Sequence, residues 1–351
     1  MRKKAVILIA VVMCCILVLS ACNNPLTSLK DLFNKKTAVV DEEQSQNPED
    51  TQNLSEVSAA QPDNSRPTVL YYKDNDNLLV PVMRYIPKAD LGIAKAAITA
   101  LIYTVESAAD LKAAGLTPTI PMGTKILGAV VKEDGLAIID FSKEFLNFSS
   151  KEAEEVGIKS LAYTLTEFSN IKKIEVRVEG KTVSELTNGT NVASLMKRSE
   201  INLQKAENTD EKLLKVMVYY NKKGSGDYSY FVPVTKLVSG YENSAEAALS
   251  ALLEGPAQGS GMTNPFPEGT QLLGIQVKDG VAYVNFSQEI LNTEGKISRD
   301  RAIIKSVTLT LKEFPSIKKV KIFVNGKTIE NTDGIGADEY IDVPVFVNYY
   351  E

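Results

Sequence analysis

The most constraining feature of this sequence is an internal repeat, which matches the chain to itself at a shift of about 146 residues. The segment Gly-Thr-Lys-Ile-Leu-Gly at 123–128 returns as Gly-Thr-Gln-Leu-Leu-Gly at 269–274. Further matches follow in the same order: Val69–Tyr72 with Met217–Tyr220, Val80–Val82 with Val232–Val234, Asp140–Ser142 with Asn285–Ser287, Glu167–Phe168 with Glu313–Phe314, and Ile201–Asn202 with Val347–Asn348. A period this long indicates a duplicated domain rather than a solenoid of short repeats.

Each copy is predicted to follow the order strand, helix, hairpin, helix, strand. The hairpin is indicated by Asp134-Gly135 in the first copy and Asp279-Gly280 in the second, because this dipeptide between apolar runs suits the positive φ angles of a tight turn. The helix before the hairpin is indicated in the second copy by Asn243 to Glu246, which resembles a capping box, and by the stop signal Gly255-Pro256.

These patterns predict an α+β fold, in which two tandem β-α-β-β-α-β domains pack their helices on one face of a mostly antiparallel sheet. We expect the first domain to occupy residues 68–202, followed by a linker at residues 203–213. The second domain then occupies residues 214–351 and includes a C-terminal strand within Ile341 to Tyr350.

The N-terminal residues have the pattern of an export signal. Arg2-Lys3-Lys4 precedes an apolar run from Ala5 to Leu19, and Leu19-Ser20-Ala21-Cys22 forms a small-residue cleavage zone. The run is shorter than the roughly 20 residues that a membrane-spanning helix needs, so a permanent transmembrane anchor is the lesser alternative. We expect residues 1–21 to be a signal peptide. The polar residues 22–67 cannot bury a core and are predicted to form a disordered tether.

The composition excludes several classes of chemistry. The chain has no His, so it lacks the imidazole that Ser-His and Cys-His nucleophiles use as a base and that ordinary zinc sites use as a ligand. Its 39 basic and 44 acidic residues give a net charge of -5, which provides no electrostatic footprint for a nucleic acid backbone. We therefore expect no enzymatic activity, no cofactor, no metal and no nucleic acid partner.

Two acidic segments resemble chemical sites. Asp140 and Glu144 could form a carboxylate pair of the kind that glycosidases use, but the second copy carries Asn285 at the position of Asp140, which favours an Asx turn that ends the strand. The segment Asp74 to Asn77 begins like a calcium loop, yet Tyr85 stands where a bidentate Glu is required. We interpret this segment as a turn.

Three tyrosine pairs are the candidate contacts for a partner protein: Tyr71 and Tyr72, Tyr219 and Tyr220, and Tyr349 and Tyr350. Neighbouring residues of a strand point to opposite faces, so one ring of each pair could be core and the other exposed, and exposed tyrosines are common at interfaces. The alternative is that both rings lie against the chain itself. Each pair accompanies a Val-Pro-Val segment, and proline cannot donate to a sheet ladder, which predicts edge strands where another chain could add.

The chain resembles the GerM-type lipoproteins of spore-forming bacteria, which are built from tandem GerMN domains. The resemblance rests on the lipobox-like residues that end at Cys22, on the polar tether, and on the duplicated pattern of Tyr-Tyr, Val-Pro-Val, Gly-Thr-x-x-Leu-Gly, Asp-Gly and Glu-Phe-x-x-Ile-Lys-Lys between residues 68 and 348. We expect Cys22 to be the site of lipid attachment. The alternative is a plain secretory signal in which Cys22 is incidental.

The resemblance implies a role in sporulation and germination and supplies no catalytic residue. We expect a lipid-anchored, non-enzymatic scaffold or adaptor at the outer face of the cytoplasmic membrane of a spore-forming bacterium, or in the space between mother-cell and forespore membranes. Its expected partners are the membrane, bound through Cys22, and proteins of a sporulation membrane complex, with weak self-association as a further expectation. The alternative function is a binding module for cell-wall glycan or muropeptide.

Overall fold

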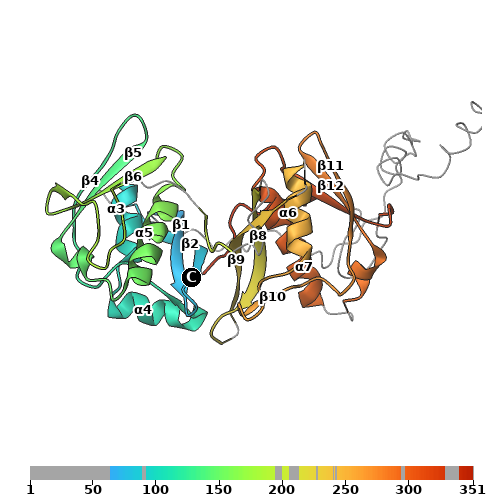
Figure 1. The fold of residues 1–351 in the computed structure, drawn as a ribbon, viewed down its shortest axis with the longest axis horizontal. Helices are drawn as coiled ribbons and strands as arrows, with labels where there is room; N and C mark the ends of the chain where they lie inside the picture. The colour runs from blue at the N-terminus through green and yellow to red at the C-terminus, as the bar shows by residue number, and fades with distance from the viewer. Residues whose placement is uncertain are drawn as a thin grey trace, which may run out of the picture.

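The computed structural model describes residues 64–88, 92–193, 200–204, 213–226, 228–239, 241, 243–293, 297–328 and 340–350. These residues form two domains of the same architecture that lie side by side (Figure 1). The expected α+β class and the duplication are confirmed. The expected signal peptide, Cys22 and nearly all of the expected tether lie outside the described residues. Residues 65–67, assigned above to the tether, already belong to the first strand.

The elements of the two domains follow the repeat with two differences. The first domain contains β1 (Ser65–Asp74), β2 (Leu79–Pro87), α3 (Ile93–Leu101), α4 (Val105–Leu111), β3 (Leu116–Thr117), β4 (Ile126–Val131), β5 (Leu136–Phe141), α5 (Lys151–Leu165), β6 (Lys173–Val178) and β7 (Lys181–Thr182). The second domain contains β8 (Leu214–Lys223), β9 (Ser229–Val238), α6 (Ser244–Leu253), β10 (Met262–Thr263), β11 (Leu272–Lys278), β12 (Val281–Phe286), α7 (Ile297–Lys312), β13 (Lys319–Val324) and β14 (Ile341–Asp342). Helix α4 has no counterpart in the described part of the second domain, and β7 and β14 come from non-equivalent segments.

The strands of each domain divide into two sheets, where a single sheet was expected. The strand orders are β2-β1-β3 and β4-β5-β6-β7 in the first domain, and β10-β8-β9 and β11-β12-β13-β14 in the second. Strand pairing is antiparallel throughout these sheets except between β5 and β6 and between β12 and β13. The prediction of mostly antiparallel pairing is therefore confirmed.

The long helices lie between the two sheets of their domain (Figure 1). Helix α5 shows why a single sheet would not suffice, since Leu161 and Leu165 and also Ser160, Tyr163 and Thr164 are buried on several sides of it. A helix that is buried nearly all round needs cover on opposite faces. The small sheet β2-β1-β3 covers one face of the helix layer, and the sheet that contains β4, β5 and β6 covers the other.

The turn and cap residues recognised in the sequence form the turns and the helix cap predicted from them. Asp279 and Gly280 both have positive φ and connect β11 to β12 as a two-residue hairpin turn, while the first copy has one residue more in this turn and uses positive φ at Gly135. The side chain of Asn243 caps α6 by accepting from the backbone N–H groups of Ala245 and Glu246. Both hairpins and this cap are confirmed.

Candidate functional site

The two domains meet through β2 and β9, which lie at the edges of their three-stranded sheets and contact each other at the centre of the molecule (Figure 1). The prolines of the first two Val-Pro-Val segments, Pro81 and Pro233, lie within these strands and pair with Tyr71 and Tyr219 on the inner strands. The prediction of edge strands is therefore confirmed for these two segments. The third segment, Val343 to Val345, lies outside any strand.

Two asparagines fasten the joint between β2 and β9. The Nδ2 group of Asn202 donates to the carbonyls of Leu79 in β2 and Pro233 in β9, both at 2.8 Å, and its Oδ1 accepts from the N–H of Leu79 at 2.9 Å. Asn348 repeats these bonds with the domains exchanged. Its Nδ2 donates to the carbonyls of Phe231 in β9 and Pro81 in β2, both at 2.8 Å, and its Oδ1 accepts from the N–H of Phe231 at 2.7 Å.

The segments that carry these asparagines cross to the opposite domain. Residues 201–204 follow the first domain and bond to Thr235 of β9 through the carbonyl of Ile201 (3.0 Å) and the N–H of Gln204 (2.9 Å). Residues 348–350 end the second domain and bond to Met83 of β2 through the carbonyl of Asn348 (2.8 Å). Each domain thus covers the outer strand of the other, and a reciprocal exchange of tails holds the pair together.

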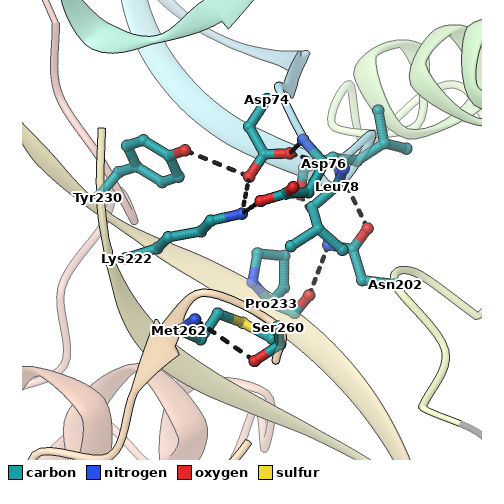
Figure 2. A network of polar contacts seen from close by, with 10 residues as sticks. Asp74, Asp76, Leu78, Asn202, Lys222, Tyr230, Pro233, Ser260 and Met262 are labelled. Atoms are coloured by element: carbon teal, nitrogen blue, oxygen red, sulfur yellow. Dashed lines mark hydrogen bonds and ion pairs between the residues drawn. The ribbon is translucent and has the colours of Figure 1, made fainter. Parts of the chain in front are cut away.

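A buried ion pair lies in the same joint (Figure 2). The Nζ of Lys222 in β8 lies 2.7 Å from Oδ2 of Asp74 in β1, and both side chains are almost fully buried, with 7% and 1% of their surface exposed. Lys222 also pairs with Asp76, and the hydroxyl of Tyr230 donates to Asp74 at 3.2 Å. The other carboxylate oxygen of Asp74 accepts from the N–H groups of Asp76 and Leu78, both at 2.9 Å. The segment that begins like a calcium loop is a turn, as predicted, and the cation it binds is a lysine.

Burial and charge act against each other in this network. Burial disfavours the ammonium of Lys222, but the hydrogen bonds and charges of Asp74 and Asp76 outweigh that effect and raise the pKa of Lys222. For Tyr230, in contrast, burial itself raises the pKa, and the adjacent Asp74 carboxylate adds to this rise. Lys222 is therefore charged and Tyr230 neutral at physiological pH, which is the state that the hydrogen bonds to Asp74 require.

Four of the six candidate tyrosines are buried inside the chain. Tyr71 and Tyr219 donate to the carboxylates of Glu167 at 2.8 Å and Glu313 at 2.6 Å, while Tyr72 and Tyr220 belong to the main core. Burial raises the pKa of Tyr72 to about 12. Of the two alternatives, the one in which both rings lie against the chain itself holds for these two pairs. Tyr71 packs with Tyr163 of α5, and Tyr219 packs with Leu309 of α7.

Tyr349 and Tyr350 remain partly exposed and fasten the C-terminal tail to the joint. The carbonyl of Tyr349 accepts from the hydroxyl of Tyr228 at 3.0 Å. The hydroxyl of Tyr350 donates to the carbonyl of Asp110 at 2.8 Å, and Arg84 lies over its ring at 5.8 Å from the centroid. Contact of these two rings with a partner protein stays a prediction.

Asp140 of the candidate carboxylate pair and its counterpart Asn285 have the same structural role. Asp140 accepts from the N–H of Gly180 at 2.9 Å, and Asn285 accepts from the N–H of Gly326 at 2.8 Å. Each bond ties the end of the second hairpin strand, β5 or β12, to the turn that follows β6 or β13, so the role is the same with or without the charge. The bond reaches across the sheet, which differs from the local Asx turn expected from the sequence. The described residues contain no group of three or more Cys, Asp or Glu side chains placed to hold a metal ion.

Fold and joint together define a tandem two-domain α+β protein whose halves are locked by exchanged tails. Residues 69–184 and 217–330 match the Germane family model, described as sporulation and spore germination. The spore germination protein GerM of Bacillus subtilis (strain 168) is 31% identical over 288 residues, covering 80% of this chain and 77% of that protein. The solved tandem GerMN domains of the Bacillus subtilis sporulation protein GerM match with a TM-score of 0.69 and 30% identity, over 82% of this chain and 100% of that one. The chain belongs to the Germane family, which gives it a role in sporulation.

Proposed function

We propose that this protein is a lipid-anchored, non-enzymatic adaptor that docks partner proteins during sporulation and germination. The lipobox-like residues before Cys22 and the polar tether support anchoring at the outer face of the cytoplasmic membrane. No helix within the described ranges has the length and apolar character needed to cross a membrane. Membership of the Germane family supports the connection with sporulation.

The observation that carries the docking proposal is the outer edge of the first domain. Strand β4 is the end strand of its sheet, so one row of its backbone groups faces away from β5. Its side chains are apolar and unusually exposed, at 50% for Leu127, 61% for Val130 and 36% for Val131. An apolar edge that no described element of the chain covers suits an added strand. The occupant we propose is an extended segment of a partner protein, paired with β4 and presenting apolar side chains.

The second copy supplies an internal comparison for this edge. Its end strand β11 has Gln276 at the position of Val130, and Ile275 at the position of Ala129 is buried. Val277, at the position of Val131, is 40% exposed, as its counterpart is. Helix α6 packs against β11 more extensively than α3 packs against β4. The second copy therefore exposes a smaller apolar surface at this edge, and the duplicated fold does not require side chains as exposed as Leu127 and Val130. The larger apolar surface of the first copy supports a role outside the folding of the domain.

The test is cross-linking of the tagged, full-length protein in its own sporulating cells, with identification of the captured proteins by mass spectrometry. Wild type is compared with Val130→Asp, which places a charge on the β4 edge, and with Val277→Asp, at an exposed valine of β11, as the matched control. We expect wild type and Val277→Asp to capture the same membrane proteins and Val130→Asp to lose them. Capture of wall fragments alone, or equal capture by all three forms, would contradict the proposal.

A further inference from the structure

The ion pair in the joint joins two equivalent positions of the duplicated domain. Tyr71-Tyr72 corresponds to Tyr219-Tyr220, so two residues further on Asp74 corresponds to Lys222. The structure places these two side chains against each other, with 2.7 Å between Nζ and Oδ2 (Figure 2). A residue meets its own equivalent only near the axis of a two-fold arrangement.

The surrounding contacts have the same two-fold symmetry. Asn202 corresponds to Asn348, Leu79 to Phe231, and Pro81 to Pro233. The bonds of Asn202 to Leu79 and Pro233 become, on exchange of the domains, the bonds of Asn348 to Phe231 and Pro81. All of these bonds use an asparagine amide and backbone groups, which both copies possess. They would form equally well between two first domains or between two second domains.

The charges at the axis are where the symmetry is broken. Two first domains joined in this way would bring Asp74 against a second Asp74, and two second domains would bring Lys222 against a second Lys222. Like charges that are buried together are strongly unfavourable, whereas the mixed pair is attractive. Tyr230 and Asp76 add to the mixed pair, since they bond to Asp74 and to Lys222 respectively.

We propose that Asp74 and Lys222 determine which domains can share this joint. The pair admits one first domain and one second domain and excludes like domains of neighbouring chains. The need for this selection follows from the anchoring proposed above. Copies of the protein held on one membrane surface would meet at high local concentration, and apart from this charge pair the edges β2 and β9 of different copies could replace one another. The exclusion itself does not depend on anchoring and is tested on the protein in solution.

The test separates the two domains only after the chain has folded. A protease site is placed within residues 205–212 of the chain that begins at residue 23, which keeps every described residue. After cleavage and incubation, native mass spectrometry counts pairs of first with second domain, first with first, and second with second. We expect the native chain to give mixed pairs alone. We expect Asp74→Asn combined with Lys222→Met to give like pairs as well, approaching the statistical ratio of one to two to one.

Two further variants make the result decisive. Lys223→Met removes an exposed charge beside the joint and is expected to leave only mixed pairs. In the uncut chain, Lys222→Asp is expected to melt at a lower temperature than Lys222→Met, because it adds repulsion to the loss of the pair. Like pairs from the native charges, mixed pairs alone from the neutral variant, or separation of the native halves after cleavage would each overturn the proposal. So would equal melting temperatures for Lys222→Asp and Lys222→Met.

Discussion

Asn202 and Asn348 make the same three hydrogen bonds from opposite sides of the joint between the two domains. Each amide bonds to the N–H and C=O of one residue in one domain and to a proline carbonyl in the other. Replacement of either side chain by Ala would remove the partner of backbone groups in both domains, which are buried around Asn348 and partly buried around Asn202. A fully buried group costs about 1–3 kcal/mol when it is left unsatisfied, and a group that water can reach costs less.

We expect Asn202→Ala and Asn348→Ala each to lower the free energy of unfolding by about 2–3 kcal/mol, with Asn292→Ala, at an exposed position, as a control within about 0.5 kcal/mol of wild type. Urea unfolding measures this cost. The double variant is expected to increase the radius of gyration in small-angle X-ray scattering, as the domains separate. A double variant that keeps the wild-type radius would show that the joint does not depend on these amides.

The stability that Lys222 supplies is expected to be lost at alkaline pH. Because the folded pKa of Lys222 is raised above its usual value of 10.5, its contribution is fully present below pH 10.5 and is lost as the pH rises through the folded value. The stability difference between wild type and Lys222→Met should therefore be constant from pH 7 to 9 and shrink above about pH 10.5. Thermal melts across this range measure it, with Lys223→Met as the reference for a neighbouring exposed lysine. A difference that stays constant to pH 12 contradicts this assignment.

Glu154 is expected to cause part of the loss of stability at acid pH. It is buried in the first turn of α5 and accepts from the N–H groups of Asn188 at 2.6 Å and Thr190 at 3.2 Å. Burial tends to raise the pKa of Glu154, but these hydrogen bonds outweigh it and lower the pKa below its usual value of 4.5. Its contribution is thus present above pH 4.5 and lost as the pH falls through the folded value.

Melting curves of Glu154→Gln and wild type should therefore differ most at neutral pH and converge toward pH 3. Glu155→Gln, one residue further along the same helix and exposed, serves as the matched control and should follow wild type at every pH. A gap between Glu154→Gln and wild type that is as wide at pH 3 as at pH 7 would show that the lost bonds, and not the charge, matter.

Asp140 is expected to tolerate the loss of its charge, since the neutral Asn285 accepts the equivalent hydrogen bond in the second domain. Asp140→Asn should change the free energy of unfolding by less than about 0.5 kcal/mol, and Asp140→Ala should cost about 1 kcal/mol because the N–H of Gly180 loses its acceptor. Chemical denaturation of both variants provides the comparison. Equal costs for Asn and Ala would mean that the carboxylate has a role beyond this bond.

The hairpins and the cap of α6 could be predicted from sequence because each depends on residues close together in the chain. The repeat could be predicted because the two copies carry the same motifs in the same order. Asp279-Gly280 determines its turn through backbone angles that these residues tolerate, and Asn243 caps a helix that starts at the next residue. The pairing of Asn202 with Asn348 as repeat positions was also visible. The hydrogen bonds that these asparagines make could not be predicted, because Asn202 bonds to a residue 123 positions away and Asn348 to one 267 positions away.

Burial was the property that sequence patterns predicted least well. Lys222 lies near the end of β8, where a lysine is ordinarily exposed. Its surroundings are not determined by the second domain alone, since Asp74 comes from the first. The same holds for Tyr71 and Tyr219, whose alternation on the strand was correctly expected. Their exposure depended on whether other layers covered both faces of the strand, and a single strand pattern carries no information about that.

The exchanged tail brings the two ends of the folded body together. Residue Ser65 pairs with Pro87 on one side of β2, and Tyr349 pairs with Met83 on the other side of the same strand. Met83 and Pro87 are four residues apart, which is about 13 Å along a strand. In topological terms the folded chain is therefore nearly a closed circle, and a short peptide could join its ends. The same fold could then begin and end elsewhere, for example at the exposed turn between β4 and β5, as a circular permutant.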